Sequence, residues 1–165
     1  MGLGRRFQNY PRLLERAYRL TLWLFTRFEP ILVRIGNERL QRWIRGPEDA
    51  GKRLLFDCRM CGQCVLHSTG MTCPMTCPKS LRNGPCGGVR ADGGCEVVPE
   101  MRCIWVEAYD RSLAMAEYGD DLRILQPPVD RQLEDTSAWV NWLTGVDRLP
   151  LPGWPDAAEK PRLEG

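Results

Sequence analysis

Hydrophobic residues near the N-terminus recur every three to four positions, which is the spacing of one face of an α-helix. Arg16, Arg19 and Arg27 lie between these positions, Arg12 precedes them, and Pro30 follows them. A basic amphipathic helix is therefore predicted, and Pro30 is expected to end or kink it because proline lacks a backbone N–H. The apolar positions are Leu13, Leu14, Tyr18, Leu22, Phe25 and Phe28.

A second helix is predicted after Pro30, closed by Gly46 and Pro47. The turn-rich composition of residues 46–57 predicts a linker. Its last apolar residues, Leu54-Leu55-Phe56, are expected to shield one face of a site formed by the cysteines that follow. The residues predicted toward one side of the second helix are Leu32, Ile35, Leu40 and Trp43.

Shorter helices are predicted further along the chain. One covers residues 104–118 and is expected to end at Gly119. Another covers residues 139–143, where Asp135-Thr136-Ser137 supplies an N-cap and Gly145 follows. Residues 149–165 contain four prolines and several charged groups, which predicts an extended or disordered tail. The longest uninterrupted apolar run is far shorter than the roughly 20 residues of a membrane span.

These patterns predict a mainly α chain with an irregular, cysteine-rich centre. Its expected parts are a basic amphipathic helical arm (1–46), a metal-binding module (47–104), a helical C-terminal part (105–148) and a Pro-rich flexible tail (149–165). Hydrophobic residues make up 43% of the 165 positions, slightly low for a chain that must bury a core alone. Bound metal is therefore expected to supply much of the folding free energy.

All eight cysteines lie in one stretch of the chain, where glycines and prolines make the backbone turn often. No secretory signal is visible, so a cytoplasmic chain with reduced thiols is expected. Metal ligation is then favoured over disulfides. The candidate metal-binding and cofactor-binding residues are Cys58, Cys61, Cys64, Cys73, Cys77, Cys86, Cys95 and Cys103.

The spacing of the thiols favours two [4Fe–4S] clusters over zinc. Structural zinc sites use paired C-x2-C knuckles, often with histidine, and the single histidine, His67, is more typical of a surface or neighbouring group than of a ligand. The C-x2-C-x2-C run suits three corners of a cubane, although its spacing to the next Cys-Pro differs from the bacterial ferredoxin pattern. Zinc remains the alternative.

Eight thiols divide into two sets of four. Cys58, Cys61 and Cys64 are assigned to one site, whereas Cys86, Cys95 and Cys103 belong mostly to the other. Cys73 and Cys77 are divided between the two sites, in an order that the sequence leaves open. The glycines of residues 83–88 would allow backbone N–H groups to approach the sulfurs, and Trp105 would either cover a cluster or pack in an ordinary core.

The cysteine-rich stretch resembles the methylenetetrahydrofolate reductase C-terminal domain family. The resemblance rests on the run from Cys58 to Gly88, above all on C-P-x3-C-P-K-x-L-x-N-G-P-C-G-G, and continues through the segments at 95–99 and 103–106. It extends to residues 109–111 and more faintly to 127–128 and 139–143. The family includes the small cysteine-rich subunit of two-component methylenetetrahydrofolate reductases.

The resemblance implies a partner and a role. The partner would be a TIM-barrel flavoprotein that reduces methylenetetrahydrofolate to methyltetrahydrofolate and carries the flavin. This chain would be an accessory iron–sulfur electron-transfer subunit, not catalytic alone and without catalytic residues of its own. An electron-donor protein would be a further partner. The alternative function is a redox-silent structural zinc module that assembles or braces the same or another oxidoreductase.

Charge is distributed unevenly along the chain. Residues 1–45 carry ten arginines and three glutamates, a charge of +7, whereas residues 104–165 carry −6. The positive arm is predicted to pack on a partner or on the metal module. Contact with a membrane surface is a less favoured alternative, and nucleic acid is not an expected partner because no recognition motif accompanies the arginines. The sequence contains no G-x-G-x-x-G or P-loop motif.

Overall fold

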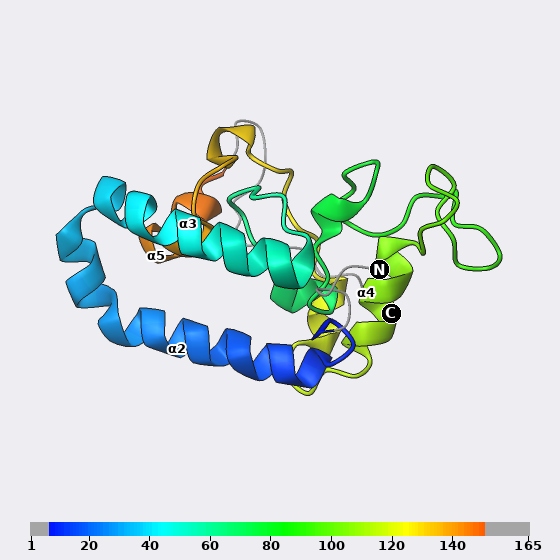
Figure 1. Ribbon diagram of the computed structural model, residues 1–165, viewed down its shortest axis with the longest axis horizontal. Coiled ribbons are helices and arrows are strands. Elements are labelled where there is room, and N and C mark those ends of the chain that lie inside the picture. Colours follow the sequence, from blue (N-terminus) through cyan, green and yellow to red (C-terminus); the bar gives the residue numbers. More distant parts are fainter. Residues whose placement is uncertain (1–6, 151–165) are drawn as a thin grey trace.

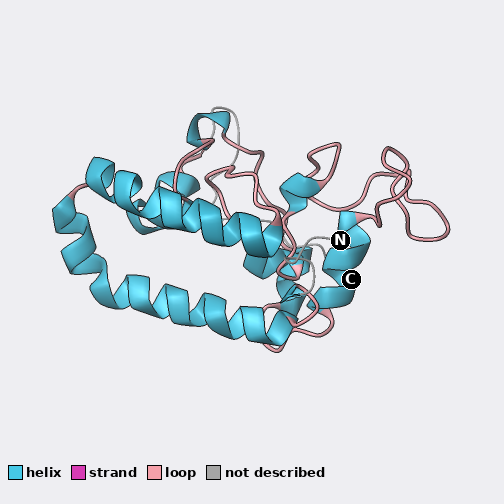
Figure 2. Cartoon of the chain, viewed as in Figure 1, coloured by secondary structure: helices cyan, strands magenta, loops and turns pink. Residues whose placement is uncertain are grey.

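The computed structural model describes residues 7–150, and these residues are mainly helical (Figures 1 and 2). The four α-helices of this part are α2 (Pro11–Ile35), α3 (Asn37–Phe56), α4 (Ile104–Ser112) and α5 (Ala138–Thr144). Short 3-10 turns lie between them: η1 (Leu66–Thr69), η2 (Pro74–Thr76), η3 (Gly119–Arg123), η4 (Arg131–Leu133) and η5 (Val146–Arg148). The predicted fold class is confirmed, including the irregular centre. The predicted tail at 149–165 lies almost entirely outside the described residues.

The two long helices form an antiparallel pair, with α5 beside α3 (Figure 1). One face of α2 packs inward through Leu14, Tyr18, Leu22 and Phe25, as the spacing predicted, whereas Leu13 and Phe28 are exposed. The helix does not end at Pro30 but continues to Ile35. Its last turns bend toward α3, and Gly36, with a φ of 90°, separates the two helices.

The predicted linker at residues 46–57 is wrong. The α3 helix runs through Gly46 and Pro47 to Phe56, and it ends at Asp57 in the left-handed conformation. An interior proline removes one helical hydrogen bond and costs about 3 kcal/mol. Packing outweighs this cost, because the inner side of α3 is buried on both sides of the proline, at Leu40 and at Lys52. Trp43, predicted to face the same way as Leu40, is instead 63% exposed.

Of the two predicted C-terminal helices, the first is shorter than predicted and the second agrees with the prediction. The α4 helix stops at Ser112, six residues before the predicted end, and Gly119 begins η3 instead of ending a helix. The α5 prediction is confirmed. Ser137 is the N-cap, its Oγ accepts a hydrogen bond of 3.2 Å from the Val140 N–H, and Gly145 ends the helix at a φ of 73°.

Two hydrophobic clusters form the core, and each contains thiols. The larger cluster gathers Leu14, Leu66, Met71, Met75 and Met115 around Cys73, with Cys61 and Cys64 packed against it. The smaller cluster joins Cys103, Trp105 and Ala108. The cysteines are therefore part of the core rather than appended to it.

Candidate metal centres

Four of the eight cysteines line one hollow beside the C-terminal end of α3. They are Cys58, Cys61, Cys64 and Cys73, and the walls between them are mostly apolar. The first three lie on the loop that follows α3, and Cys73 immediately precedes η2. We call this hollow the first site.

The loop of the first three cysteines is held by the C-terminal part of the chain. Met60 and Gly62 both have positive φ values, of 45° and 74°. A Cβ at position 62 would overlap the Leu133 backbone carbonyl, so only glycine fits there. The Asn141 side-chain amide donates a hydrogen bond of 2.9 Å to the Gly62 carbonyl. The geometry of the first site therefore depends on α5 and η4, more than 70 residues away.

The thiols of Cys58 and Cys73 interact with each other. A hydrogen bond between the two thiols lowers the pKa of Cys58 to about 6, and the same bond, together with burial, raises the pKa of Cys73. The Met60 N–H donates to the Cys58 sulfur at 3.3 Å and favours its thiolate as well. Burial of its sulfur raises the pKa of Cys64, a half-buried residue at the wall of a pocket. Metal binding requires deprotonated thiolates, so it would release the protons of these thiols.

A buried ion pair borders the first site. Lys52 Nζ lies 2.5 Å from Glu48 Oε1, and both side chains are almost completely buried. Ser137 donates a hydrogen bond to the second Glu48 oxygen. Burial disfavours the charge of Lys52, but attraction to Cys64, Glu48 and Cys58 outweighs burial and raises its pKa. Lys52 is therefore a cation close to two of the four thiols.

Arg82 is a second buried cation at the first site. Its side chain lines the same hollow, and the residue is 8% exposed. Its Nη2 donates to the Gln63 carbonyl at 3.0 Å. Among the described residues, its Nε and Nη1 atoms are buried without a hydrogen-bond partner. A buried guanidinium with two unsatisfied nitrogens is costly, so its surroundings are suited to a negatively charged group.

The remaining four cysteines line a second hollow. We call it the second site; it is formed by Cys77, Cys86, Cys95 and Cys103. Paired backbone hydrogen bonds hold its loop, from the Cys95 N–H to the Met101 carbonyl and from the Cys103 N–H to the Gly93 carbonyl, both at 2.9 Å.

The two sites contain equally buried cysteines, one buried and three half-buried in each, but the charged pair beside the second site is closer to solvent. A half-exposed ion pair, Lys79–Glu96, lies beside it, and Glu96 Oε1 is 3.5 Å from the Cys86 sulfur. The Gly88 N–H donates to the Cys86 sulfur and lowers its pKa. This contact is of the kind predicted for the glycines of residues 83–88.

The two sites divide the cysteines as the sequence suggested. Cys73 joins the C-x2-C-x2-C cysteines, and Cys77 joins the other three. Only the three residues of η2 lie between Cys73 and Cys77. The structure thus brings together all eight predicted residues in two sets of four, while their metal ligation stays a prediction.

Aromatic residues cover both sites. Trp105 is buried against Cys103, and its indole N–H donates to the Leu81 carbonyl at 3.2 Å. Phe56 lines the first site, whereas Leu54 is 57% exposed and Leu55 lines a neighbouring pocket. Of the three apolar residues predicted to shield the first site, only Phe56 lines its wall.

His67 lines neither hollow. Its ring stacks on Tyr18 at 5.5 Å and meets Tyr118 edge to face at 5.8 Å. The Tyr18 hydroxyl lies 3.3 Å from His67 Nδ1. These contacts give His67 a packing role between α2 and the loop before η3.

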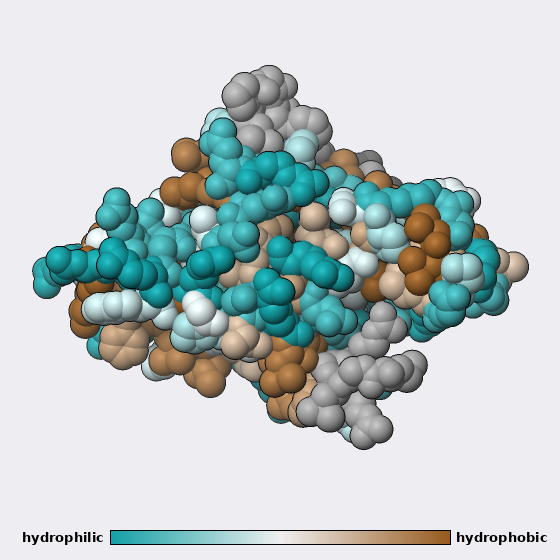
Figure 3. Space-filling view, turned by 45° about the horizontal axis from the view of Figure 1, so that its top comes forward, coloured by the Kyte–Doolittle hydropathy of each residue, from teal (hydrophilic) through white to brown (hydrophobic). Residues whose placement is uncertain are grey.

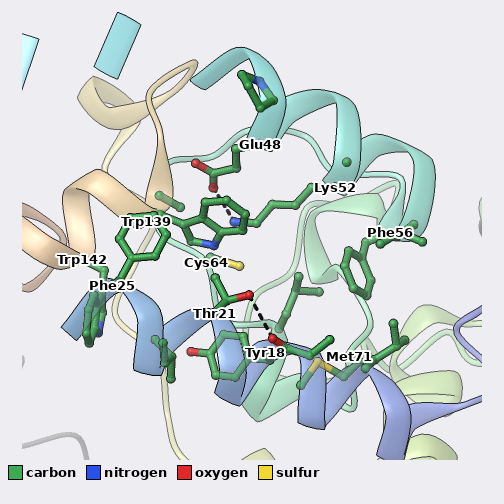
Figure 4. A pocket seen from close by; sticks show the side chains of 18 of the residues that line it. Tyr18, Thr21, Phe25, Glu48, Lys52, Phe56, Cys64, Met71, Trp139 and Trp142 are labelled. Carbon is green, nitrogen blue, oxygen red and sulfur yellow. Dashed lines mark hydrogen bonds and ion pairs between the residues drawn. The ribbon is translucent and has the colours of Figure 1, made fainter. Parts of the chain in front are cut away.

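A third feature is a pocket between α2, α3 and α5, which is partly open to solvent (Figure 4). Phe25, Trp139 and Trp142 form aromatic walls, and Lys52 Nζ lies 5.1 Å from the centre of the Trp139 ring. The sulfur of Cys64 points toward the same pocket. Cys64 therefore lines both this pocket and the first site.

The positively charged border of the first site would suit an anionic group. Four thiolates around either a zinc ion or a cubane leave a net negative charge, and Arg82 and Lys52 border the first site with positive charge. Within residues 7–150, all eight thiols are free, and no three histidine, cysteine or acidic side chains converge on one ion position. The ligands of a cubane bind four separate irons and stand further apart than the ligands of a single ion.

Sequence reasoning missed the charged residues around the first site. Lys52 and Glu48 lie four apart on one helix face, but the predicted linker placed them outside any helix. Arg82 lies between Leu81 and Asn83 with no distinguishing pattern. Only the knowledge that α3 continues past Pro47 would have placed the ion pair beside the cysteines.

Comparison with known protein families gives a match over the centre of the chain. Residues 38–132 match the family described as "Methylene-tetrahydrofolate reductase C terminal", which is more than half of the chain. The chain belongs to this family. No curated protein and no solved structure matches it.

Membership of the methylene-tetrahydrofolate reductase C-terminal family confirms the resemblance and changes the range of residues that it covers. The match begins in α3, about 20 residues before the first cysteine, so it includes Lys52 as well as Arg82. It ends at residue 132, before the 139–143 segment in which the resemblance was faint. The α2 helix precedes the matched region. Within residues 7–150, no helix is both long and apolar enough to span a membrane.

Proposed function

We propose that this protein is the iron–sulfur electron-transfer subunit of a flavin-dependent methylenetetrahydrofolate reductase. The observation that carries the proposal is the arrangement of eight cysteines in two hollows of four, within a chain of the methylene-tetrahydrofolate reductase C-terminal family. A [4Fe–4S] cluster at each site would supply one-electron transfer. The flavin and the folate site belong to the partner.

The chemistry of the reductase requires an electron supply. Reduction of methylenetetrahydrofolate to methyltetrahydrofolate consumes two electrons and two protons, and a flavin accepts electrons singly or in pairs. In this proposal the chain contributes ligands, buried charge and apolar cover. The thiols would hold the clusters, Lys52 and Arg82 would balance negative charge, and Phe56 and Trp105 would limit the access of water.

The outer face of α2 is the docking surface that we propose for the flavoprotein. It carries two parallel rows of exposed residues, each with i, i+7, i+11 and i+18 spacing. Figure 3 shows hydrophobic side chains gathered along the lower edge of the molecule, over α2. A mixed apolar and basic surface of this kind suits an acidic partner with an apolar centre. The apolar row is Leu13, Leu20, Leu24 and Ile31, and the second row consists of three arginines and a tryptophan, Arg16, Trp23, Arg27 and Arg34.

The first experiment is a metal analysis of anaerobically purified protein. About eight irons per chain with matching sulfide would support two cubanes. About two zinc ions without iron would refute electron transfer and leave a structural zinc module that braces the same partner. The second step mixes the dithionite-reduced chain, freed of excess reductant, with the oxidised flavoprotein subunit. Bleaching of the flavin absorption band is the expected result.

A further inference from the structure

The charges around the two sites differ in number and in burial. The first site is bordered by two buried cations, Lys52 and Arg82, and by one buried anion, Glu48. The second site is bordered by Lys79 and Glu96, which pair with each other and are about 40% exposed. The first site therefore lies in a field of net positive charge that water screens little, whereas the charges at the second site cancel and are screened.

A buried positive charge raises the reduction potential of a nearby cluster. Reduction adds one negative charge to a cluster, and a nearby cation stabilises the reduced form more than the oxidised form. The effect is larger where the effective dielectric constant is low. Burial alone acts in the opposite direction, because it disfavours the more highly charged reduced form. A buried site without cations would thus be hard to reduce.

We infer that Lys52 and Arg82 raise the reduction potential of the first site above that of the second, so that electrons enter at the second site, whose bordering charges are half exposed, and move to the first site, whose bordering charges are buried. This inference rests on the proposed function, since it requires clusters at both sites. Each transfer is one electron: the second site is oxidised and the first is reduced, and an external one-electron donor, such as dithionite in vitro, restores the second site.

Arg82 offers a sharper test than Lys52. Among the described residues, two of its side-chain nitrogens have no hydrogen-bond partner, whereas Lys52 is paired with Glu48. The Arg82→Gln variant removes the charge and keeps an N–H donor for the Gln63 carbonyl, whereas Arg82→Lys keeps the charge. Lys52→Gln is a second, independent variant, in which the amide still donates to Glu48. Lys79→Gln is the matched control, because it removes an exposed cation at the second site.

The measurement is a potentiometric titration of the anaerobic, metal-loaded protein, followed by electron paramagnetic resonance. Cys58→Ser and Cys95→Ser identify which signal belongs to which site, since each replaces one ligand. We expect the first-site midpoint to lie above the second. It should fall in Arg82→Gln and Lys52→Gln, stay near the wild-type value in Arg82→Lys, and be unaffected by Lys79→Gln.

Each outcome decides between the inference and its alternatives. First-site midpoints that are unchanged in both glutamine variants, or that lie below the second-site midpoint in the wild type, overturn the inference and leave the proposed function standing. Zinc without iron in the metal analysis removes the proposed function itself, before any variant is made. A fall in the first-site midpoint that Arg82→Lys does not show supports a charge effect over a structural one.

Discussion

Replacing Glu15 with glutamine should destabilise the protein by about 2–4 kcal/mol. Glu15 lies on α2 and is 2% exposed. Its carboxylate accepts three backbone hydrogen bonds from the loop after α4: from the N–H groups of Ala116 (2.9 Å), Glu117 (2.8 Å) and Tyr118 (2.9 Å). One side chain thus fastens α2 to a segment about 100 residues later.

The size of the expected destabilisation follows from the hydrogen bonds that a glutamine side chain can still accept. Its single carbonyl oxygen can keep the two bonds that Oε1 accepts, but as neutral bonds, which are roughly half as strong as charged ones. The Ala116 N–H would face an amide N–H₂ group and lose its acceptor. An unsatisfied donor costs about 1–3 kcal/mol, and the weakening of two charged bonds adds about 1 kcal/mol or more.

The assay is urea unfolding of the anaerobic, metal-loaded protein, followed by far-UV circular dichroism. Glu29→Gln is the matched control, because Glu29 lies on the same helix, is exposed and has no partner among the described residues. We expect the control to change stability by less than about 0.5 kcal/mol. If Glu15→Gln changed the free energy of unfolding as little as the control does, the three hydrogen bonds of Glu15 would not be stabilising the fold.

The same carboxylate predicts a dependence on pH. Burial pushes the pKa of Glu15 upward, but the three backbone hydrogen bonds and Arg19 together outweigh it, so the pKa lies below its ordinary value of 4.5. A lowered folded-state pKa means that the stabilisation is complete above the unfolded-state pKa and is lost as the pH falls through the folded-state pKa. The difference between wild type and Glu15→Gln should therefore shrink below about pH 4.5.

Three further predictions concern the sites and the docking surface. Gly62→Ala should lower both stability and first-site metal content, because its Cβ would overlap backbone; Gly46→Ala, in an open part of α3, should be neutral or stabilising by up to about 1 kcal/mol. Cys73→Ser and Cys77→Ser should each lower the iron content by up to half and affect different resonance signals; a loss of the same signal in both would contradict the division. Complex formation with the flavoprotein should weaken as salt increases and should be weaker in Arg27→Gln; an affinity indifferent to both would exclude α2 as the docking surface.

Local signals predicted some elements well. Ser137 and Gly145 mark the ends of α5 because capping depends on the residue itself and on its nearest neighbours. The two sets of cysteines were predictable in outline for a similar reason, since short spacings keep Cys58, Cys61 and Cys64 together. The inner face of α2 followed from hydrophobic periodicity.

Elements that depend on distant contacts were predicted poorly. Gly46 and Pro47 favour a helix end, yet α3 continues because Glu48 and Lys52 pair in the interior and Glu48 binds Ser137. Arg82 belongs to the first site only because the fold returns its loop to Cys58 and Cys73. Such long-range packing is absent from any local pattern, so propensity alone could not reveal it.

The η2 turn has a consequence for the spacing of the two sites. Cys73 and Cys77 are joined by three residues, so the gap between the hollows is fixed by bond lengths and torsion angles within one turn. A packed interface can slide when a partner binds, but a single covalent turn has almost no such freedom. An electron crossing between the sites would travel beside a continuous chain of bonds, and the distance that it crosses should be the same whether the protein is alone or docked.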